Sequence, residues 1–487
     1  MDPHATIDTT TSNARSGTSS LKLVATAAWQ GTSQLVSVAV GSTYTLSGWA
    51  RSTSGTAYIT LISFNASAVE IGAHTDVILG GTGSWRWSSV SYVPPTGATQ
   101  VWVGMQSSGS GTFWFDDLNM TAGVAPVPTP TPLPTTTPVP TVTPAPTPGA
   151  GLSGLHVQGN KLVNASGQTV VLHAINRAGS EYMCVGGGGG GGGVFDGPFD
   201  QASVTAMKSW RVNAVRMGLN EDCWLGINGA PQGYSAATYQ TAIKNYVNLL
   251  NSNGIYVILE LHWSAPGTQL ATGQQPMPDL DHTPTFWSQV ANAFKANTAV
   301  IFEPYNEPYP DGGAANTTAG WTCWRDGGTC SGISFQVAGM QTLVNSIRAT
   351  GATNVVALGG LRWSNYLTQW LAYKPGDATG NLVAAWHTYD FNTCNTVSCY
   401  DTTVAPVAAV VPVIATEIGT NSCSATFLNT LMSWLDGKGI GYLAWQWQGP
   451  PGSWYSTACS EITLISDFTG TPTTYGLIYK QHLAILP

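Results

Sequence analysis

Charged residues are scarce in this chain. Only 9% of its 487 residues are Asp, Glu, Lys or Arg, whereas a typical soluble protein has about 25%. The net charge is −8 at pH 7, and Lys and Arg never gather into a cluster along the sequence. Because nucleic-acid binding depends on basic patches that neutralise phosphates, this composition argues against a nucleic-acid partner.

Long apolar runs are also missing. A membrane-spanning helix needs about 18 or more consecutive apolar residues, and no stretch of the sequence reaches that length. We therefore expect no membrane span. The first residues, Met1-Asp2-Pro3-His4, contain neither the basic segment nor the apolar core of a signal peptide, so we expect any secretion signal to lie outside this sequence.

Cysteine is absent before residue 184 and occurs eight times in all. An even count in a chain with other secretory traits favours disulfides. We expect the pairs Cys184–Cys223, Cys323–Cys330, Cys394–Cys399 and Cys423–Cys459. The second and third pairs are close in sequence, whereas the other two are an interpretation, because spacing does not fix connectivity. A zinc site is the alternative, weakened by the lack of a C-x-x-C pair and of a histidine at ligand spacing from a cysteine pair.

Aromatic and uncharged polar residues take the place of charge. The chain has 19 tryptophans and 18 tyrosines among many Ser, Thr, Asn, Gln and Gly residues. Aromatic faces pack on the apolar faces of sugars, and amides bond to hydroxyl groups. The composition therefore suits an uncharged, hydroxyl-rich ligand, although it also suits any secreted protein with a low-charge surface.

A Pro/Thr-rich segment, residues 124–150, divides the chain. It holds ten prolines and eight threonines, which exclude helix and sheet and favour an extended polyproline spacer. Residues 1–123 precede it and residues 151–487 follow it. We expect a linker between two folded domains; a peptide ligand for another protein is the alternative.

Residues 1–123 contain short alternating runs separated by Gly, Ser and Thr turns. The strand candidates are 35–40, 44–50, 58–64, 90–93, 101–105 and 112–120. This pattern predicts an all-β sandwich or jelly roll. The usual opening strand is not evident before Ile7.

Residues 151–487 alternate between apolar strand candidates and amphipathic segments. The strands begin near Val170, Ala214, Tyr256, Ala299, Asn354, Leu382, Val411 and Gly441. One intervening stripe, Tyr239 to Leu250, has apolar residues at helical spacing. Eight strand–helix units predict a (β/α)₈ barrel, whose chemistry takes place at the C-terminal ends of the strands.

Polar residues converge at those strand ends. Glu307 closes the fourth strand within Asn306-Glu307-Pro308, and Glu417 closes the seventh. Other strand ends offer Arg216, His262, His387 with Tyr389, and Trp445. Two carboxylates at the mouth of one barrel are what glycosidic bond cleavage requires, because one protonates the leaving oxygen and the other attacks or activates water.

The chain from about residue 152 to its end resembles glycoside hydrolase family 5. The resemblance rests on Arg216, His262, Asn306-Glu307-Pro308, His387-x-Tyr389 and Glu417-Ile418-Gly419, in the right order and each at a strand end. It implies that Glu307 is the general acid/base and that Glu417 is the nucleophile. It also implies that Arg216, His262, Asn306, His387, Tyr389 and Trp445 form the substrate-binding site, and that no metal or cofactor is needed.

Several other residues compete for these roles. Glu221 also follows an Asn at a strand end, but Cys223 rather than proline comes after it, so we do not favour it as catalytic. Glu260 and Glu303 lie deeper in their strands and are interpreted as structural. Trp447 shares a strand face with Trp445 and could replace it as the sugar platform.

The loop after the first strand departs from the family. Residues 186–193 are eight consecutive glycines, which offer a ligand no side chain and cost much entropy to order. Any substrate contact that the family makes from this loop is therefore in question.

Residues 1–123 resemble jelly-roll carbohydrate-binding modules of the family 4/9 type. The matches are Trp29-Gln30-Gly31, the stretch 41–49 ending in Trp49, and residues 113–118. The resemblance implies polysaccharide binding, for which we favour Trp29, Trp85 and Trp87, while Trp49 and Trp114 are expected in the core. A sandwich domain that binds nothing is the alternative.

Taken together, the sequence predicts a secreted, monomeric, endo-acting retaining β-1,4-glucanase that hydrolyses cellulose or a related β-glucan. The same mechanism acting on mannan or xylan is the nearest alternative. A non-catalytic polysaccharide-binding protein is the alternative from another class.

Overall fold

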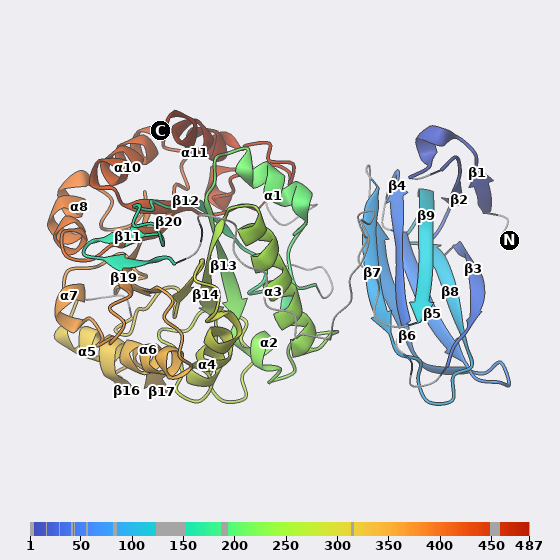
Figure 1. The fold of residues 1–487 in the computed structure, drawn as a ribbon, viewed down its shortest axis with the longest axis horizontal. Helices are drawn as coiled ribbons and strands as arrows, with labels where there is room; N and C mark the ends of the chain where they lie inside the picture. The colour runs from blue at the N-terminus through green and yellow to red at the C-terminus, as the bar shows by residue number, and fades with distance from the viewer. Residues whose placement is uncertain are drawn as a thin grey trace, which may run out of the picture. The chain divides into compact units, whose positions relative to one another are not determined.

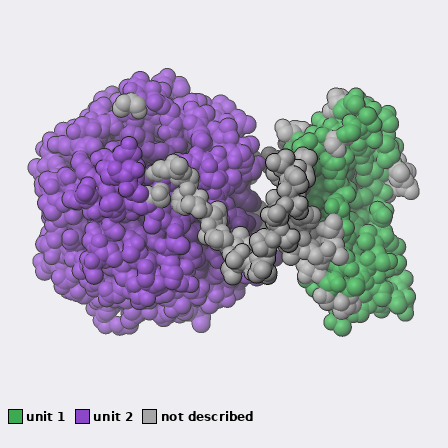
Figure 2. All heavy atoms as spheres, viewed as in Figure 1, with its two compact units in different colours: residues 1–140 green, residues 141–487 purple. Residues whose placement is uncertain are grey.

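A computed structural model describes residues 4–122 and 152–486, except residues 16, 29, 40–41, 43, 55–56, 81–84, 153, 187–192, 313–315 and 449–457. The chain divides into two compact units, residues 1–140 and 141–487 (Figure 2). The predicted linker, residues 124–150, and six of the eight glycines of the loop after the first barrel strand lie outside the described residues.

The N-terminal unit contains two antiparallel sheets (Figure 1). One has the strand order β1-β2-β9-β4-β7 and the other β3-β8-β5-β6. The strands are β1 (Ala5–Asp8), β2 (Ser20–Ala25), β3 (Gly31–Ser37), β4 (Tyr44–Ser52), β5 (Ala57–Phe64), β6 (Glu70–Gly80), β7 (Arg86–Tyr92), β8 (Gln100–Ser107) and β9 (Gly111–Ala122). Leu23 and Phe113 of the first sheet share one core with Ile59 and Val101 of the second. The expected all-β character is therefore present, and the opening strand that the sequence did not reveal is β1.

Of the two tryptophans expected in the core of this unit, one is buried and one is partly exposed. Phe113 and Phe115 belong to the apolar cluster between the sheets, and Trp114 between them lies on the opposite face, where it is also buried and its indole nitrogen donates to Asp8 at 2.9 Å. Trp49 is partly exposed and has the Arg15 guanidinium 4.2 Å from its ring centre. The prediction is confirmed for Trp114, which is buried, and is wrong for Trp49, because aromatic character alone does not reveal which face of a strand a residue occupies.

The second unit is a closed barrel of eight parallel strands in chain order. Its strands are β12 (His173–Arg177), β13 (Ala214–Asn220), β14 (Tyr256–Trp263), β15 (Val300–Glu303), β18 (Val356–Gly359), β19 (Leu382–Tyr389), β20 (Val413–Gly419) and β21 (Gly441–Ala444). Each begins within about three residues of its predicted start, so the predicted (β/α)₈ barrel is confirmed. The strands are mostly buried on both faces, which explains their runs of Val, Ile, Leu and Ala.

The inside of the barrel changes character along the strands. On β14, alternate side chains point inward, and Ile258 belongs to an apolar cluster with Ile301 and Leu443. The same cluster includes Leu162 of the short hairpin formed by β10 (His156–Gln158) and β11 (Lys161–Val163), which therefore covers the N-terminal end of the barrel. Further along β14 the inward residues are Glu260 and then His262, so polar groups fill the C-terminal half.

Helices surround the strands (Figure 1). They are α1 (Gln201–Lys208), α2 (Glu221–Leu225), α3 (Ala236–Ser252), α4 (Thr283–Phe294), α5 (Thr318–Asp326), α6 (Met340–Ala349), α7 (Trp370–Tyr373), α8 (Val397–Thr403), α9 (Ala405–Ala408), α10 (Ala425–Lys438) and α11 (Thr474–Ile485), with a short hairpin of β16 (Gly327–Thr329) and β17 (Gln336–Ala338) after α5. Short 3₁₀ turns are η1 (Thr11–Asn13), η2 (Met183–Val185) and η4 (Cys459–Glu461). The predicted stripe from Tyr239 to Leu250 lies in α3 and faces the core. Among the described residues, no helix combines the length and the apolar character that a bilayer span requires.

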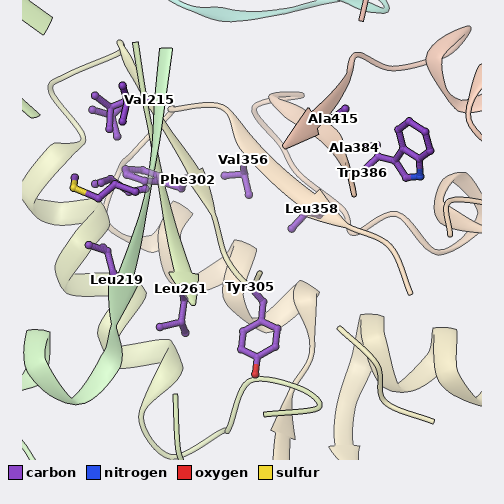
Figure 3. Packing of buried hydrophobic residues seen from close by; sticks show 14 of the residues in the cluster. Val215, Leu219, Leu261, Phe302, Tyr305, Val356, Leu358, Ala384, Trp386 and Ala415 are labelled. Atoms are coloured by element: carbon purple, nitrogen blue, oxygen red, sulfur yellow. The ribbon is translucent and has the colours of Figure 1, made fainter. Parts of the chain in front are cut away.

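The outward faces of the strands form the larger hydrophobic core with these helices. Figure 3 shows Val215, Leu261 and Phe302 of neighbouring strands within this cluster. Ile243 of α3 and Val290 of α4 belong to the same cluster. Packing on this outer side fixes the strands, so the inward polar residues are held on rigid elements.

All four predicted disulfides are present: Cys184–Cys223, Cys323–Cys330, Cys394–Cys399 and Cys423–Cys459. None of these cysteines lies within a barrel strand. Each belongs to a loop or short helix that follows a strand, on the side where the C-terminal strand ends meet. The predicted pairing is confirmed, and the bonds hold the segments that surround the polar end of the barrel.

Candidate active site

Arg216 of β13 is the centre of the polar end of the barrel. Its Nε donates to Glu303 Oε2 at 2.6 Å, and its Nη1 donates to Glu417 Oε1 at 2.8 Å. Its Nη1 and Nη2 also donate to Asn176 Oδ1 at 2.9 Å and to Asn306 Oδ1 at 2.6 Å. The side chain has no exposed surface. The enclosed guanidinium holds the carboxylate of Glu417 and the amide of Asn306, and a contact of Arg216 with substrate stays a prediction.

Glu417 lies near the end of β20 and is held by two donors. Arg216 approaches Oε1, and the Tyr389 hydroxyl donates to Oε2 at 2.5 Å. The Tyr389 ring lies against Gly419, where any side chain would collide with it, and it stacks on Phe391 with ring centres 5.0 Å apart. These contacts fix the phenol, which in turn orients the carboxylate of Glu417.

Glu307 follows β15 and has the more open carboxyl of the two. Its side chain is 21% exposed, whereas that of Glu417 is 4% exposed. His387 Nδ1 lies 2.9 Å from Glu307 Oε1. One carboxylate oxygen of Glu307 and one of Glu417 lie within 4.8 Å of each other. The structure therefore brings together the two carboxylates that the sequence singled out.

The proton positions around His387 follow from its partners. Thr416 Oγ1 donates its proton to Glu303 Oε1 at 2.9 Å. The Thr416 oxygen can therefore only accept from His387 Nε2, which lies 3.0 Å from it. Burial, together with Arg216, lowers the pKa of His387 well below its ordinary value, so the ring is neutral. A neutral ring with a proton on Nε2 has an accepting Nδ1. Glu307 must therefore supply the proton of the hydrogen bond between them.

The electrostatics of the cluster agree with a protonated Glu307. Burial raises its pKa well above the ordinary value, and the charge of Glu417 raises it further. Burial also raises the pKa of Glu417, but Arg216, His262 and Tyr389 oppose the shift. Glu417 is therefore the carboxyl that ionises first, and Glu307 is the one that keeps its proton.

Other buried carboxyls surround this pair. Burial raises the pKa of Glu303 to about 7 and that of Glu181 to about 7. Although burial opposes its charge, the Glu260 carboxylate 2.7 Å away raises the pKa of His262 to about 9. With His262 and Arg216 as the cations of the cluster, not all of these carboxyls can be ionised together, which again favours a proton on Glu307.

The Thr416 hydroxyl gives a prediction about pH dependence. In Thr416→Val, Nε2 of His387 loses its acceptor, so the ring can place its proton on Nδ1 and donate to ionised Glu307. The pKa of Glu307 should then fall, and the alkaline limb of the kcat/KM profile should move to lower pH by about one unit. Thr388→Val is the matched control, because the Thr388 hydroxyl donates to the Cys394 carbonyl instead. An unchanged alkaline limb in Thr416→Val would contradict this proton arrangement.

His262 and Trp445 line the site next to the carboxylates. Trp445 is partly exposed and stacks on the His262 ring with centres 5.4 Å apart and planes at 18°. Trp447 is fully buried and packs edge-on against Trp210. Of the two tryptophans that the sequence offered, Trp445 is therefore the one that a ligand can reach.

Several residues around the site were not found from the sequence. Asn176 of β12 and Thr416 join the buried network described above. Trp363, which is 39% exposed, stacks on Tyr309 at 4.9 Å, and its backbone N–H donates to Pro308 O at 3.2 Å. It follows β18, for which we had proposed no functional residue, so an aromatic residue just after a strand end was the available signal.

The same cluster could in principle hold a cation. Single ligand atoms of Glu307, His387 and Glu417 lie within 4.8 Å of one another. Both oxygens of Glu417 already accept hydrogen bonds, and the Arg216 guanidinium adjoins them. The guanidinium would repel a positive ion, so we do not interpret these three residues as a metal site.

Glu221, the competing candidate, lies in α2 and not with Glu307 and Glu417. It is fully buried, and its Oε2 accepts from Thr283 Oγ1 at 2.6 Å. The same hydroxyl lies 3.2 Å from Asp279 Oδ2. One hydroxyl proton cannot serve both carboxyls, so they share a proton. Burial, together with the charge of Asp279, raises the pKa of Glu221 well above its ordinary value.

The raised pKa of Glu221 predicts that the protein loses stability as the pH rises. The folded state keeps a proton on Glu221 that the unfolded state releases above about pH 4.3. The free energy of unfolding should therefore fall by about 1.4 kcal/mol per pH unit from there up to the folded pKa. Glu221→Gln keeps a donor for Asp279 and cannot ionise. Thermal unfolding from pH 5 to 9 should show that the stability of the variant relative to the wild type increases with pH. A difference in stability that does not change with pH would contradict the shared proton.

A parallel barrel with two carboxyls of different proton affinity at the C-terminal ends of its strands defines a class, the glycosidases that work by two acidic groups. Comparison with known families agrees. The model of the cellulases, glycosyl hydrolase family 5, matches residues 165–450, more than half of the chain. The chain belongs to glycoside hydrolase family 5.

Individual relatives are distant. The endoglucanase CelA of Streptomyces lividans is 24% identical over 294 residues, covering 58% of this chain and 52% of the relative. A mannan endo-1,4-β-mannosidase of Salipaludibacillus agaradhaerens is 24% identical over 323 residues, covering 63% and 86%. The chain thus spans about half the length of the endoglucanase. A β-glucanase structure from Saccharophagus degradans, 19% identical with a TM-score of 0.52, covers 72% of this chain and 97% of its own, and shares the fold.

Proposed function

We propose that the protein is a retaining endo-β-1,4-glycanase, with cellulose or a related β-glucan as its substrate. The observation that carries the mechanism is the carboxyl pair: oxygens of Glu307 and Glu417 lie within 4.8 Å of each other. Retaining enzymes have carboxyl groups about 5–5.5 Å apart, whereas inverting enzymes leave about 6.5–9.5 Å for a water molecule. The short separation supports direct attack by one carboxylate.

In the first step, Glu307 gives its proton to the glycosidic oxygen as the bond from that oxygen to C1 breaks. Glu417 forms an ester bond to C1, and the released chain leaves with a free hydroxyl group. In the second step, water attacks C1 and passes a proton to the Glu307 carboxylate, and Glu417 departs as a carboxylate. Both residues return to their starting states, and the product keeps the β configuration.

The remaining site residues divide into two groups. Asn306 is proposed to donate to the 2-hydroxyl of the reacting sugar, while His262 and Trp445 contact the same ring or its neighbour. Arg216, Tyr389 and His387 are largely enclosed. They are proposed to act by holding Glu417 ionised and Glu307 protonated.

Two kinds of relative favour two substrates, because endoglucanases and a mannanase both match. Reducing-sugar release from carboxymethyl-cellulose, β-mannan and xylan tests the choice. Activity on carboxymethyl-cellulose above the other two is expected. Activity on mannan or xylan alone would be compatible with the proposed mechanism but would contradict the proposed substrate. No release from any of the three would contradict the proposed function.

We further propose that residues 1–123 form a jelly-roll module that binds polysaccharide, joined by a spacer over residues 124–150 to a catalytic domain over residues 151–487. Trp85 is partly exposed beside the Arg51 guanidinium. Trp29 and the side chain of Trp87 lie outside the described residues. A spacer of about 3.1 Å per residue would keep the enzyme near an insoluble polymer. The disulfides support secretion, and we propose a monomer.

A further inference from the structure

Gln274 links the two residues of the Asn306-Glu307 dipeptide from outside the barrel strands. It lies in the loop between β14 and α4 and is partly buried. Its Oε1 accepts from Asn306 Nδ2 at 2.5 Å, and its Nε2 donates to the main-chain oxygen of Glu307 at 2.9 Å. One amide therefore contacts both the side chain of Asn306 and the backbone of the acid/base residue.

The hydrogen bonds run from Arg216 through Asn306 and Gln274 to the main-chain oxygen of Glu307, and the two end groups fix which atom donates in each bond. A guanidinium only donates, so Asn306 must turn its Oδ1 toward Arg216, 2.6 Å away. A carbonyl only accepts, so Gln274 must turn its Nε2 toward the Glu307 oxygen. Gln274 then offers Oε1 to Asn306 Nδ2. Of the two hydrogens on that nitrogen, Gln274 engages one, and no group in the described part of the chain accepts the other, which is left for a ligand.

The loop that carries Gln274 is itself attached to the same strand end. The Tyr305 hydroxyl donates to Gln275 O at 2.7 Å and accepts from Gln275 N at 3.1 Å. Tyr309 N donates to Pro276 O at 2.9 Å. Residues on both sides of the Asn306-Glu307 dipeptide thus bind the backbone just after Gln274, which holds its amide at a set distance.

We propose that Gln274 is a positioning residue that fixes the rotation of the Asn306 amide, so that its second N–H points at the 2-hydroxyl of the reacting sugar. This inference rests on the proposed function and assigns a role to a loop residue outside the strand ends. Because the 2-hydroxyl contact strengthens in the transition state, loss of Gln274 should lower kcat more than it raises KM.

The test uses dinitrophenyl β-cellobioside and its analogue without the 2-hydroxyl on the ring that bears the leaving group. Gln274→Met, which has a similar shape and no amide, should lose about tenfold in kcat/KM on the parent compound and less than about twofold on the 2-deoxy compound. Gln275→Met is the matched control, because Gln275 acts through its main chain. It should change both rates by less than about twofold.

The ratio of the two rates does not depend on how much of each preparation is folded, so a poorly folding variant still gives an answer. An equal loss on both compounds, or no loss on the parent, would overturn the positioning role and leave the proposed function standing. A wild type that hydrolyses neither compound would contradict the proposed function, and this inference with it.

Discussion

Glu417→Ala is expected to lower kcat about 10⁴-fold or more, because the reaction loses the atom that bonds to C1. Sodium azide should restore activity to this variant. The vacated space lies between Arg216 and Tyr389, two donors that now hold the carboxylate and that would accept a small anion. Azide attacks from the face that Glu417 used, so the product should be the α-glycosyl azide, identified by NMR of its anomeric proton.

Glu461→Ala, at a partly exposed glutamate of η4, is the control and should keep wild-type activity with or without azide. Rescue of Glu417→Ala that yields the β-glycosyl azide, or a wild type whose first product is the α-anomer, would exclude Glu417 as the nucleophile. Absence of rescue together with an unchanged kcat would remove Glu417 from the mechanism.

Glu307→Gln should show a loss that depends on the leaving group. A polysaccharide leaves as a poor alkoxide and needs the proton, so its hydrolysis should slow by about 10²–10⁴-fold. Dinitrophenolate leaves without a proton, so the first step on dinitrophenyl β-cellobioside should slow far less. The pre-steady-state burst of dinitrophenol separates this step from the hydrolysis of the intermediate.

The same variant should lose the alkaline limb of the pH profile. In the proposed mechanism the wild type is active while Glu307 is protonated, and burial beside Glu417 raises the pKa of Glu307 well above its ordinary value. Wild-type activity therefore falls as pH rises through that raised pKa, whereas glutamine has no proton to lose. A matching loss on both substrates, with the alkaline limb intact, would show that Glu307 is not the acid.

Much of this site could be predicted because, in a parallel barrel, residues at the C-terminal ends of the strands lie close together in space. Glu307, His387 and Glu417 each stand where a buried strand ends, and parallel strands bring such ends together. The sequence could not show that Arg216 is fully enclosed, because enclosure depends on residues from four other strands. The proposed role of Gln274 could not be predicted for a related reason. Loops have no periodicity, and the role depends on a contact across the mouth of the barrel.

The N-terminal unit marks another limit. The alternating runs predicted most of its strands, but Trp114 shows that a large aromatic residue can occupy either face. Side chains alternate between the two faces of a strand. Phe113 and Phe115 belong to the core between the sheets, so Trp114 must lie on the other face. Reading the alternation from the phenylalanines would have placed Trp114 on the opposite face of the sheet, where it is buried beside Asp8.

The disulfides divide the catalytic domain into two parts with different vulnerabilities. All eight cysteines are bonded, and every bond joins segments on the side of the barrel where the substrate would enter. None of these four disulfides joins the barrel strands or the apolar cluster at the opposite end, which depend on packing and on the hydrogen bonds between strands. Reduction should therefore disturb the loops around the entrance before it disturbs the barrel, so we expect the geometry of the site to be more sensitive to reducing conditions than the fold is.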